Sequence, residues 1–276
     1  MTEKILFRNA DLVYHRNGNG PAVILVHGFP ESSAMWDDFS KELSKEFTVI
    51  TPDLPGHGAS GLPQGLSSVE EFADAVHAVA AHTGVKKFTL LGHSMGGYIT
   101  MAFAKKYEKE NLLNGIGLFH STVFADNDEK KVGRNRAIEA AKKDKTSFIA
   151  ELIPGLFAKE NQERLSAEIN KLKEIAKQCS PESLVASLSA MRDRSDTSDF
   201  TKETSLPFLF IMGKKDNSVP FDKNFPAASF PKKSFSIILD NVAHMGFLEA
   251  RDETFFAVRN FLKFCTGNYL WPNVNL

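Results

Sequence analysis

The chain has 276 residues, of which 42% are hydrophobic and 24% charged, a composition typical of a folded globular protein. Its 33 Lys and Arg residues balance 34 Asp and Glu residues, and the net charge of −1 gives no electrostatic basis for binding nucleic acid or an anionic membrane. We see no apolar run of about 18 residues and no basic region followed by an apolar run at the N-terminus, so we expect no membrane span, no secretory signal and a cytoplasmic location.

The first half of the chain alternates short apolar runs with helical patterns. Residues 4–7 and 11–15 predict a hairpin at the edge of a sheet. Buried strands are predicted at 23–26, 47–50, 88–91 and 116–119, with helices between them at 33–45, 68–82 and 95–107. Ser67 and Glu70 give the second helix the spacing of a capping box. Unbroken apolar strands separated by helices are typical of a parallel sheet covered on both faces.

Residues 122–200 interrupt this alternation, because they contain helical patterns and no strand. An apolar stripe at 148–157 bends at Pro154-Gly155, a second stripe covers 165–175, and Ser180-Pro181 begins another helix. A weaker stripe lies at 126–143. The charges of this segment nearly cancel, which favours solvated helix faces over a nucleic-acid surface.

After residue 205 the alternating pattern resumes, with strands at 208–212 and 235–239 and a last helix near 246–264. We therefore predict an α/β fold: a mostly parallel sheet of about eight strands with helices on both faces. Residues 1–121 plus 201–276 would form the core, and residues 122–200 an all-helical cap inserted after the sixth strand. Such a cap would lie over the carboxyl edge of the sheet, where open α/β sheets bind ligands.

The predicted strand 88–91 leads directly into Gly92-His93-Ser94-Met95-Gly96, and a helical pattern follows at once. The G-x-S-x-G pattern is weak by itself, but a strand before it and a helix after it indicate a nucleophile elbow. Glycines at positions 92 and 96 remove side chains that would collide with the neighbouring strand and helix. The Ser94 hydroxyl is then expected at the N-terminus of the helix, where negative charge is stabilised.

A serine nucleophile needs a histidine base and an acid that orients the histidine. Asp216 follows the strand 208–212, and His244 follows the strand 235–239, so both are expected at the same edge of the sheet as Ser94. The order Ser, Asp, His is the one expected for this kind of site. Asp240 is the rival acid, disfavoured because only three residues separate it from His244.

Two backbone N–H groups are candidates to bind the oxyanion, those of Met95 and of Phe29 in the loop after the first core strand. Candidate residues of a substrate pocket are His120, Phe124, Phe148 and Phe157. Core packing is the competing interpretation for the three phenylalanines. For His120, as for the other histidines near strand ends, a hydrogen-bonded structural role is the alternative.

The segments HGFP, DLPGHGAS, GHSMGG, GKKDNSVP and AHMGFLE occur in this order. Together they resemble the α/β-hydrolase superfamily, in its branch with a helical cap, and the resemblance covers the predicted core. It implies Ser94, Asp216 and His244 as the catalytic triad and Phe29 and Met95 as oxyanion donors. Epoxide hydrolases and haloalkane dehalogenases share the HGFP loop but carry aspartate in place of Ser94, so their chemistries are disfavoured.

Residues 56–61 match G-x-G-x-x-G, but no helix pattern follows them, so we expect no dinucleotide site, and we infer no cofactor and no metal. The predicted function is a serine hydrolase acting by acyl transfer on a small-molecule ester, a carboxylesterase for small to medium acyl groups. Alternatives in the same fold are carbon–carbon bond hydrolysis, lactone opening and perhydrolysis. A ligand receptor without turnover is the alternative of another class. The oligomeric state stays open, and the tail 268–276 could pack on its own core or on a partner.

Overall fold

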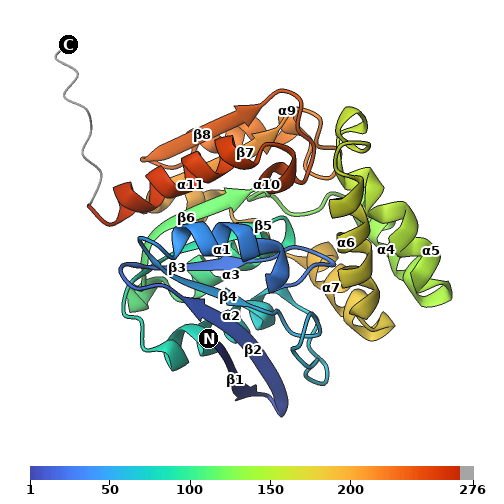
Figure 1. The fold of residues 1–276 in the computed structure, drawn as a ribbon, viewed down its shortest axis with the longest axis horizontal. Coiled ribbons are helices and arrows are strands. Elements are labelled where there is room, and N and C mark those ends of the chain that lie inside the picture. Colours follow the sequence, from blue (N-terminus) through green and yellow to red (C-terminus); the bar gives the residue numbers. More distant parts are fainter. Residues whose placement is uncertain (268–276) are drawn as a thin grey trace.

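The computed structural model describes residues 1–267, in which eight strands form one sheet in the order β1-β2-β4-β3-β5-β6-β7-β8 (Figure 1). The strands are β1 (Thr2–Phe7), β2 (Ala10–Asn17), β3 (Ala22–Val26), β4 (Thr48–Pro52), β5 (Phe88–His93), β6 (Leu113–Phe119), β7 (Phe208–Gly213) and β8 (Ser234–Leu239). The hairpin β1–β2 joins β4 in antiparallel pairing, and all other neighbours pair in parallel. The predicted fold class is confirmed.

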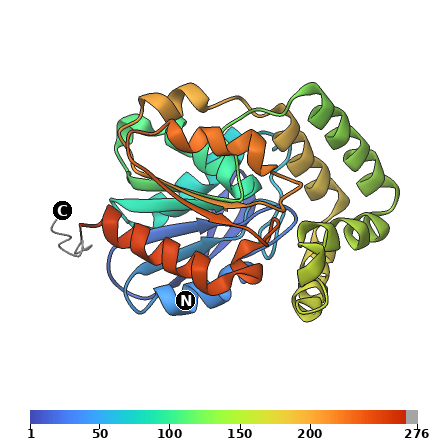
Figure 2. The ribbon, with the colours of Figure 1, turned by 90° about the horizontal axis from the view of Figure 1, so that it is seen from above.

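The central strands are buried on both faces, which explains their unbroken apolar sequences. In β3, Ile24 and Val26 belong to one hydrophobic cluster, whereas Val23 and Leu25 belong to the other. Successive side chains of a strand point to opposite faces, so a strand covered on both sides shows no polar alternation. The first cluster packs against α2 (Val69–Thr83) and α3 (Met95–Lys106), and the second against α1 (Asp37–Leu43) and α11 (Arg251–Cys265). Figure 2 shows the sheet between α11 and the helices of the opposite face.

The capping box of α2 lies one residue later than the sequence pattern placed it. Ser68 is the N-cap: its hydroxyl accepts the N–H of Glu71 at 3.3 Å, and the Glu71 carboxylate accepts the N–H of Ser68 at 3.1 Å. The helix begins at Val69 because this side chain is buried in the first cluster. The helix expected at 33–45 is also shorter, since a 3-10 turn (Ser33–Trp36) precedes α1.

The chain between β6 and β7 is helical, as expected. We call residues 128–203 the helical insert; it contains α4 (Asp128–Lys143), α5 (Lys145–Leu152), α6 (Ser166–Gln178), α7 (Pro181–Asp193) and α8 (Ser198–Glu203). Short 3-10 turns, Pro154–Leu156 and Lys159–Asn161, separate α5 from α6 at the predicted bend. Both views place α4 to α7 together beyond one end of the sheet (Figures 1 and 2). The role of the helical insert as a cap domain stays a prediction.

Of the remaining short helices, a 3-10 turn (Glu108–Glu110) lies between α3 and β6. The others flank the last strand: α9 (Phe221–Asn224) and a 3-10 turn (Phe225–Ser229) precede β8, and α10 (Gly246–Glu249) precedes α11. Within residues 1–267 none of the helices is both long and apolar enough to cross a bilayer. The prediction made for the tail lies outside the described residues.

Candidate active site

Ser94 occupies a sharp turn between the end of β5 and the start of α3. Its backbone has φ +51° and ψ −117°, a conformation that costs free energy for any residue with a side chain. Hydrogen bonds hold the turn, since the Ser94 N–H donates to the Phe119 carbonyl at 2.9 Å and its carbonyl accepts the Ser121 hydroxyl at 2.8 Å. The turn thus has the geometry of a nucleophile elbow.

The two glycines of the elbow are needed because other backbone atoms lie where side chains would be. A Cβ atom at Gly96 would lie 2.4 Å from the Val26 carbonyl oxygen, and one at Gly92 would lie 2.1 Å from the Gly96 carbonyl oxygen. Side-chain carbon atoms essentially never approach backbone this closely. The steric reason predicted for both glycines is confirmed.

Ser94, His244 and Asp216 form a hydrogen-bonded row. His244 Nε2 lies 2.8 Å from Ser94 Oγ, and His244 Nδ1 lies 2.8 Å from Asp216 Oδ2. A carboxylate can only accept hydrogen bonds, so Nδ1 carries the proton and Nε2 is free to accept the serine hydroxyl. The rival acid, Asp240, lies on the surface in an ion pair with Lys214.

Asp216 is a buried carboxylate held by several donors. Its Oδ1 accepts the N–H groups of Ser218 at 2.9 Å and Val219 at 2.8 Å. Burial by itself would raise the pKa of the Asp216 carboxyl, but the charge of His244 and the hydrogen bonds from His120 and His244 outweigh it. The pKa therefore lies well below its ordinary value, and the acid is ionised at neutral pH.

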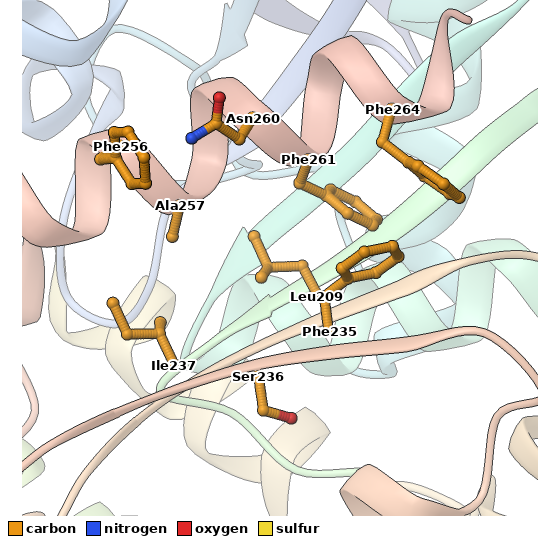
Figure 3. A pocket seen from close by; sticks show the side chains of 9 residues that line it. All are labelled: Leu209, Phe235, Ser236, Ile237, Phe256, Ala257, Asn260, Phe261 and Phe264. Carbon is orange, nitrogen blue, oxygen red and sulfur yellow. The ribbon is translucent and has the colours of Figure 1, made fainter. Parts of the chain in front are cut away.

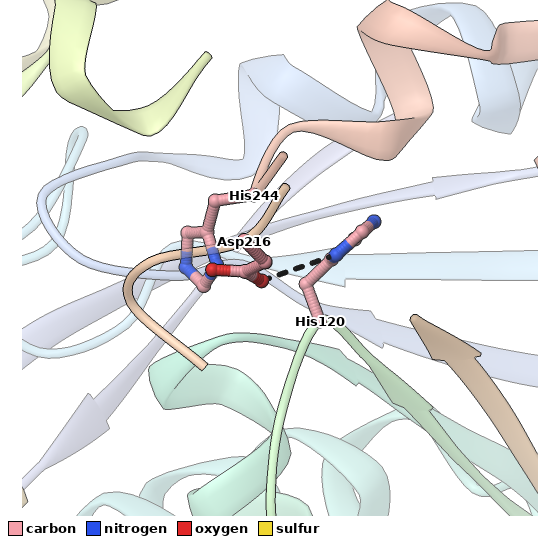
Figure 4. A group of neighbouring side chains, drawn as sticks. All are labelled: His120, Asp216 and His244. Carbon is pink, nitrogen blue, oxygen red and sulfur yellow. Dashed lines mark hydrogen bonds and ion pairs between the residues drawn. The ribbon is translucent and has the colours of Figure 1, made fainter. Parts of the chain in front are cut away.

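His120 lies behind Asp216, which supports the hydrogen-bonded structural role given as its alternative; a pocket role for this histidine stays a prediction. Its Nδ1 lies 3.3 Å from Asp216 Oδ2, and Figure 4 shows the carboxylate between the rings of His120 and His244. A backbone φ of +47° at the end of β6 turns the ring inward, where it is almost fully buried. Burial lowers the pKa of His120 to about 4, so the ring is neutral and donates from Nδ1.

Within residues 1–267, His120, Asp216 and His244 also form a group whose spacing could hold a metal ion. Their ligand atoms all lie within 4.8 Å of one another. Two imidazoles and a carboxylate are a common ligand set for zinc and other transition metals. However, the separations of 2.8 and 3.3 Å between imidazole nitrogen and carboxylate oxygen are hydrogen-bond lengths, and these bonds account for the arrangement. We assign the three residues no metal-binding role.

The predicted oxyanion donors have free N–H groups. Among the hydrogen bonds of residues 1–267, none is donated by the backbone N–H of Phe29 or of Met95. The N–H of the adjacent Gly28 donates to the Glu31 carboxylate at 2.6 Å and is not available to a substrate, whereas that of Phe29 is available. Met95 opens α3, whose N-terminus favours negative charge. Their role toward a substrate stays a prediction.

Sequence reasoning missed a buried pair between Glu31 and His93. His93 Nδ1 lies 3.2 Å from Glu31 Oε2, and His93 Nε2 donates to the carbonyl of His244 at 2.8 Å. Burial alone would lower the pKa of His93, but the Glu31 carboxylate raises it above its ordinary value. The pair connects the loop after β3 to the loop of His244. The sequence offered no signal for it, since the partners are 62 residues apart.

The three candidate pocket phenylalanines differ in their surroundings. Phe157 is buried in the second hydrophobic cluster, which is the core-packing alternative, and Phe148 is half-buried against both clusters. Phe124 packs edge-on against Phe230 and borders a cavity of about 490 Å³ beside Asn217. For all three a pocket role stays a prediction.

An apolar cavity of about 350 Å³ lies elsewhere, between β8 and α11 (Figure 3). Phe235, Phe261 and Phe264 are among its lining side chains, and none of the three residues of the hydrogen-bonded row contributes to it. The cavity is therefore separate from the candidate active site.

Comparisons with known proteins agree with the fold. The profile of the alpha/beta hydrolase fold matches residues 21–251. A thermophilic esterase from Thermogutta terrifontis, solved with malate bound, superposes with a TM-score of 0.89 at 30% identity, over 96% of this chain and 99% of that one. A pimeloyl-[acyl-carrier protein] methyl ester esterase of Aeromonas salmonicida is 26% identical over 259 residues, 90% of this chain and 97% of that protein.

A higher identity, 38%, is found with an uncharacterized protein of Mycobacterium tuberculosis, but over 90 residues only. This match covers 33% of the present chain and 26% of the mycobacterial protein, so it carries no information on activity. The family profile, by contrast, spans most of the chain, from β3 to the start of α11. The chain belongs to the alpha/beta hydrolase fold family.

Proposed function

We propose that this chain is a serine hydrolase that cleaves carboxylic esters by acyl transfer, with Ser94 as nucleophile, His244 as base and Asp216 as the orienting acid. The observation that carries the proposal is the row of two 2.8 Å contacts from the serine hydroxyl through the imidazole to the carboxylate. Nothing else in residues 1–267 pairs a serine, a buried histidine and an ionised acid at a strained turn before a helix.

In the first half of the reaction, His244 Nε2 takes the proton of Ser94 as Oγ bonds to the ester carbonyl carbon. The N–H groups of Phe29 and Met95 donate to the oxyanion that forms. His244 then gives its proton to the leaving alcohol oxygen as the carbon–oxygen bond breaks. Asp216 keeps the imidazole in the correct tautomer and stabilises its charged form.

In the second half, water replaces the alcohol. His244 takes a proton from the water, whose oxygen attacks the acyl carbon, and the second tetrahedral intermediate collapses to release the acid and restore the serine hydroxyl. Every proton passes through the same imidazole nitrogen. The buried Asp216 carries the compensating negative charge throughout.

The esterases among the related proteins support an ester as the substrate, but three other functions compete. Lactone opening and carbon–carbon bond hydrolysis can use the same three residues. A receptor that binds a ligand without turnover could also keep them. Turnover numbers separate these possibilities when they are measured on p-nitrophenyl esters, on lactones and on diketones of matched size.

The decisive test combines covalent labelling with turnover. A fluorophosphonate should transfer its phosphonyl group to Ser94 Oγ with loss of fluoride, which adds the mass of this group to the peptide that contains Ser94. The parent should also release many equivalents of p-nitrophenol per protein. Ser94→Ala should lose both, although oxyanion donors can leave a residual rate of about 10³–10⁴ over water. A Ser94→Ala variant with the parent's turnover would refute the proposal. Labelling of the parent without turnover of any ester, lactone or diketone would favour the receptor.

A further inference from the structure

The loop that carries His244 is held by hydrogen bonds from three consecutive backbone N–H groups. Those of Ala243 and Met245 donate to Glu249 Oε1, at 3.0 and 3.1 Å. The N–H of His244 itself donates to the carbonyl of Leu156, at 2.9 Å. One carboxylate oxygen thus binds the residues on both sides of the histidine, and a residue of the helical insert binds the histidine backbone.

The other oxygen of Glu249 faces the helical insert. Glu249 Oε2 accepts the N–H of Ala158 at 2.8 Å and the side-chain amide of Asn161 at 2.9 Å. The Asn161 amide also reaches the carbonyl of Asn241 at 2.9 Å, and Arg164 donates to the Glu249 carbonyl at 3.0 Å. Glu249 therefore has two arms, one on the histidine loop and one on the segment 156–161.

A buried carboxylate is costly unless donors replace its hydration. Glu249 is 8% exposed and receives four N–H donors. Hydrogen bonds to an ionised acceptor are roughly twice as strong as neutral ones, so the carboxylate fixes both segments firmly. The residues between β8 and α10 form no regular secondary structure, which makes their position dependent on these bonds.

We propose that Glu249 is a positioning residue, which holds the His244 imidazole in line with Ser94 and couples its loop to segment 156–161 of the helical insert. The inference rests on the proposed function, because it assigns the position of His244 a role in catalysis. It predicts that catalysis depends on the hydrogen bonds of Glu249, which reach the loop of His244 from the side away from Ser94.

Three substitutions separate the two arms. Glu249→Gln keeps one acceptor oxygen, but its amide group must face donors on the other side, so one arm is lost. Glu249→Ala loses both arms. Asn161→Ala leaves the arm to the histidine loop intact, but removes one donor of the arm to the helical insert and the bond from Asn161 to the Asn241 carbonyl. The matched control is Glu46→Gln, because the half-exposed Glu46 carboxylate is also bound by more than one donor, Arg259 and Lys263, which belong to α11.

The measurements are kcat and KM on an ester that the parent turns over, the pH profile of kcat/KM, and the melting temperature. A small displacement of a catalytic group can cost about 10²-fold in rate. We expect kcat of Glu249→Gln to fall by about 10- to 100-fold with KM much less changed and the acidic limb of the profile displaced. The kcat of Glu249→Ala should fall further and that of Asn161→Ala less, whereas Glu46→Gln should keep the parent's kcat.

A folded Glu249→Gln variant with the parent's kcat and pH profile would overturn the inference, even if its melting temperature is lower. If this variant does not fold, Asn161→Ala decides, and a kcat equal to the parent's overturns the coupling. Ser94→Ala, assayed on the same ester, distinguishes the two proposals. If it stays active the proposed function fails, and if it is inactive while Glu249→Gln is normal only the present inference fails.

Discussion

The replacement of Asp216 by asparagine tests the hydrogen-bonded row most directly. Asp216 Oδ1 accepts two backbone N–H groups, from Ser218 and Val219, so an asparagine would keep its oxygen there and turn its amide group toward His244. His244 Nδ1 would then have to accept a hydrogen bond. Its proton would move to Nε2, and this nitrogen could no longer take the proton of Ser94.

The same carboxylate-to-amide change in a Ser-His-Asp triad lowers kcat by about 10⁴, which corresponds to about 5 kcal/mol of transition-state stabilisation. His120 Nδ1 also donates to Asp216 Oδ2, the oxygen that the amide group of asparagine would replace. His120 would lose its acceptor as well, and it cannot supply a new acceptor to His244. We expect a loss of about this size in kcat for Asp216→Asn.

The assay is steady-state ester hydrolysis at pH 7 to 8, with the circular dichroism spectrum as evidence that the variant is folded. Asp240→Asn is the control, because Asp240 is an aspartate on the surface, paired with Lys214. It should keep the parent's kcat. A folded Asp216→Asn variant that loses less than about tenfold in kcat would refute the proposed role of Asp216.

Two further predictions concern stability. Gly96→Ala places a Cβ atom 2.4 Å from the Val26 carbonyl oxygen and should cost about 2 kcal/mol or more in urea unfolding, whereas Gly155→Ala meets nothing within 4 Å and should be neutral or slightly stabilising. Equal stabilities for the two variants would contradict the steric argument. His120 has a folded pKa of about 4, against an unfolded value of 6.5, so the unfolded chain binds its proton first as pH falls. The stability due to the neutral ring is therefore complete above pH 6.5 and is lost toward pH 4, by about 3 kcal/mol. His120→Asn should flatten the dependence of the unfolding free energy on pH in this window, and an unchanged slope would count against a neutral buried ring.

Local sequence patterns were sufficient to predict the structure where the burial or the steric contacts of a residue depend on its close neighbours in the chain. The capping box of α2 shows the limit of such patterns. Two serines precede two glutamates, Ser67-Ser68 and Glu70-Glu71, so either pair fits the spacing. The burial of Val69 in the core fixed the first residue of the helix, and with it the pair that caps.

The sequence by itself determined the strands, the glycines of the elbow and the edge of the sheet at which Ser94, Asp216 and His244 meet. It could do so because carboxyl ends of parallel strands lie at one edge, whatever the details of packing. Only the tertiary structure decided that His120 lies behind Asp216, that Glu31 pairs with His93, and that Glu249 joins the loop of His244 to the helical insert. Such contacts link segments up to 96 residues apart, and their partners depend on how whole elements pack. Hydrophobic periodicity records which residues are buried, but it does not record which buried polar groups face one another.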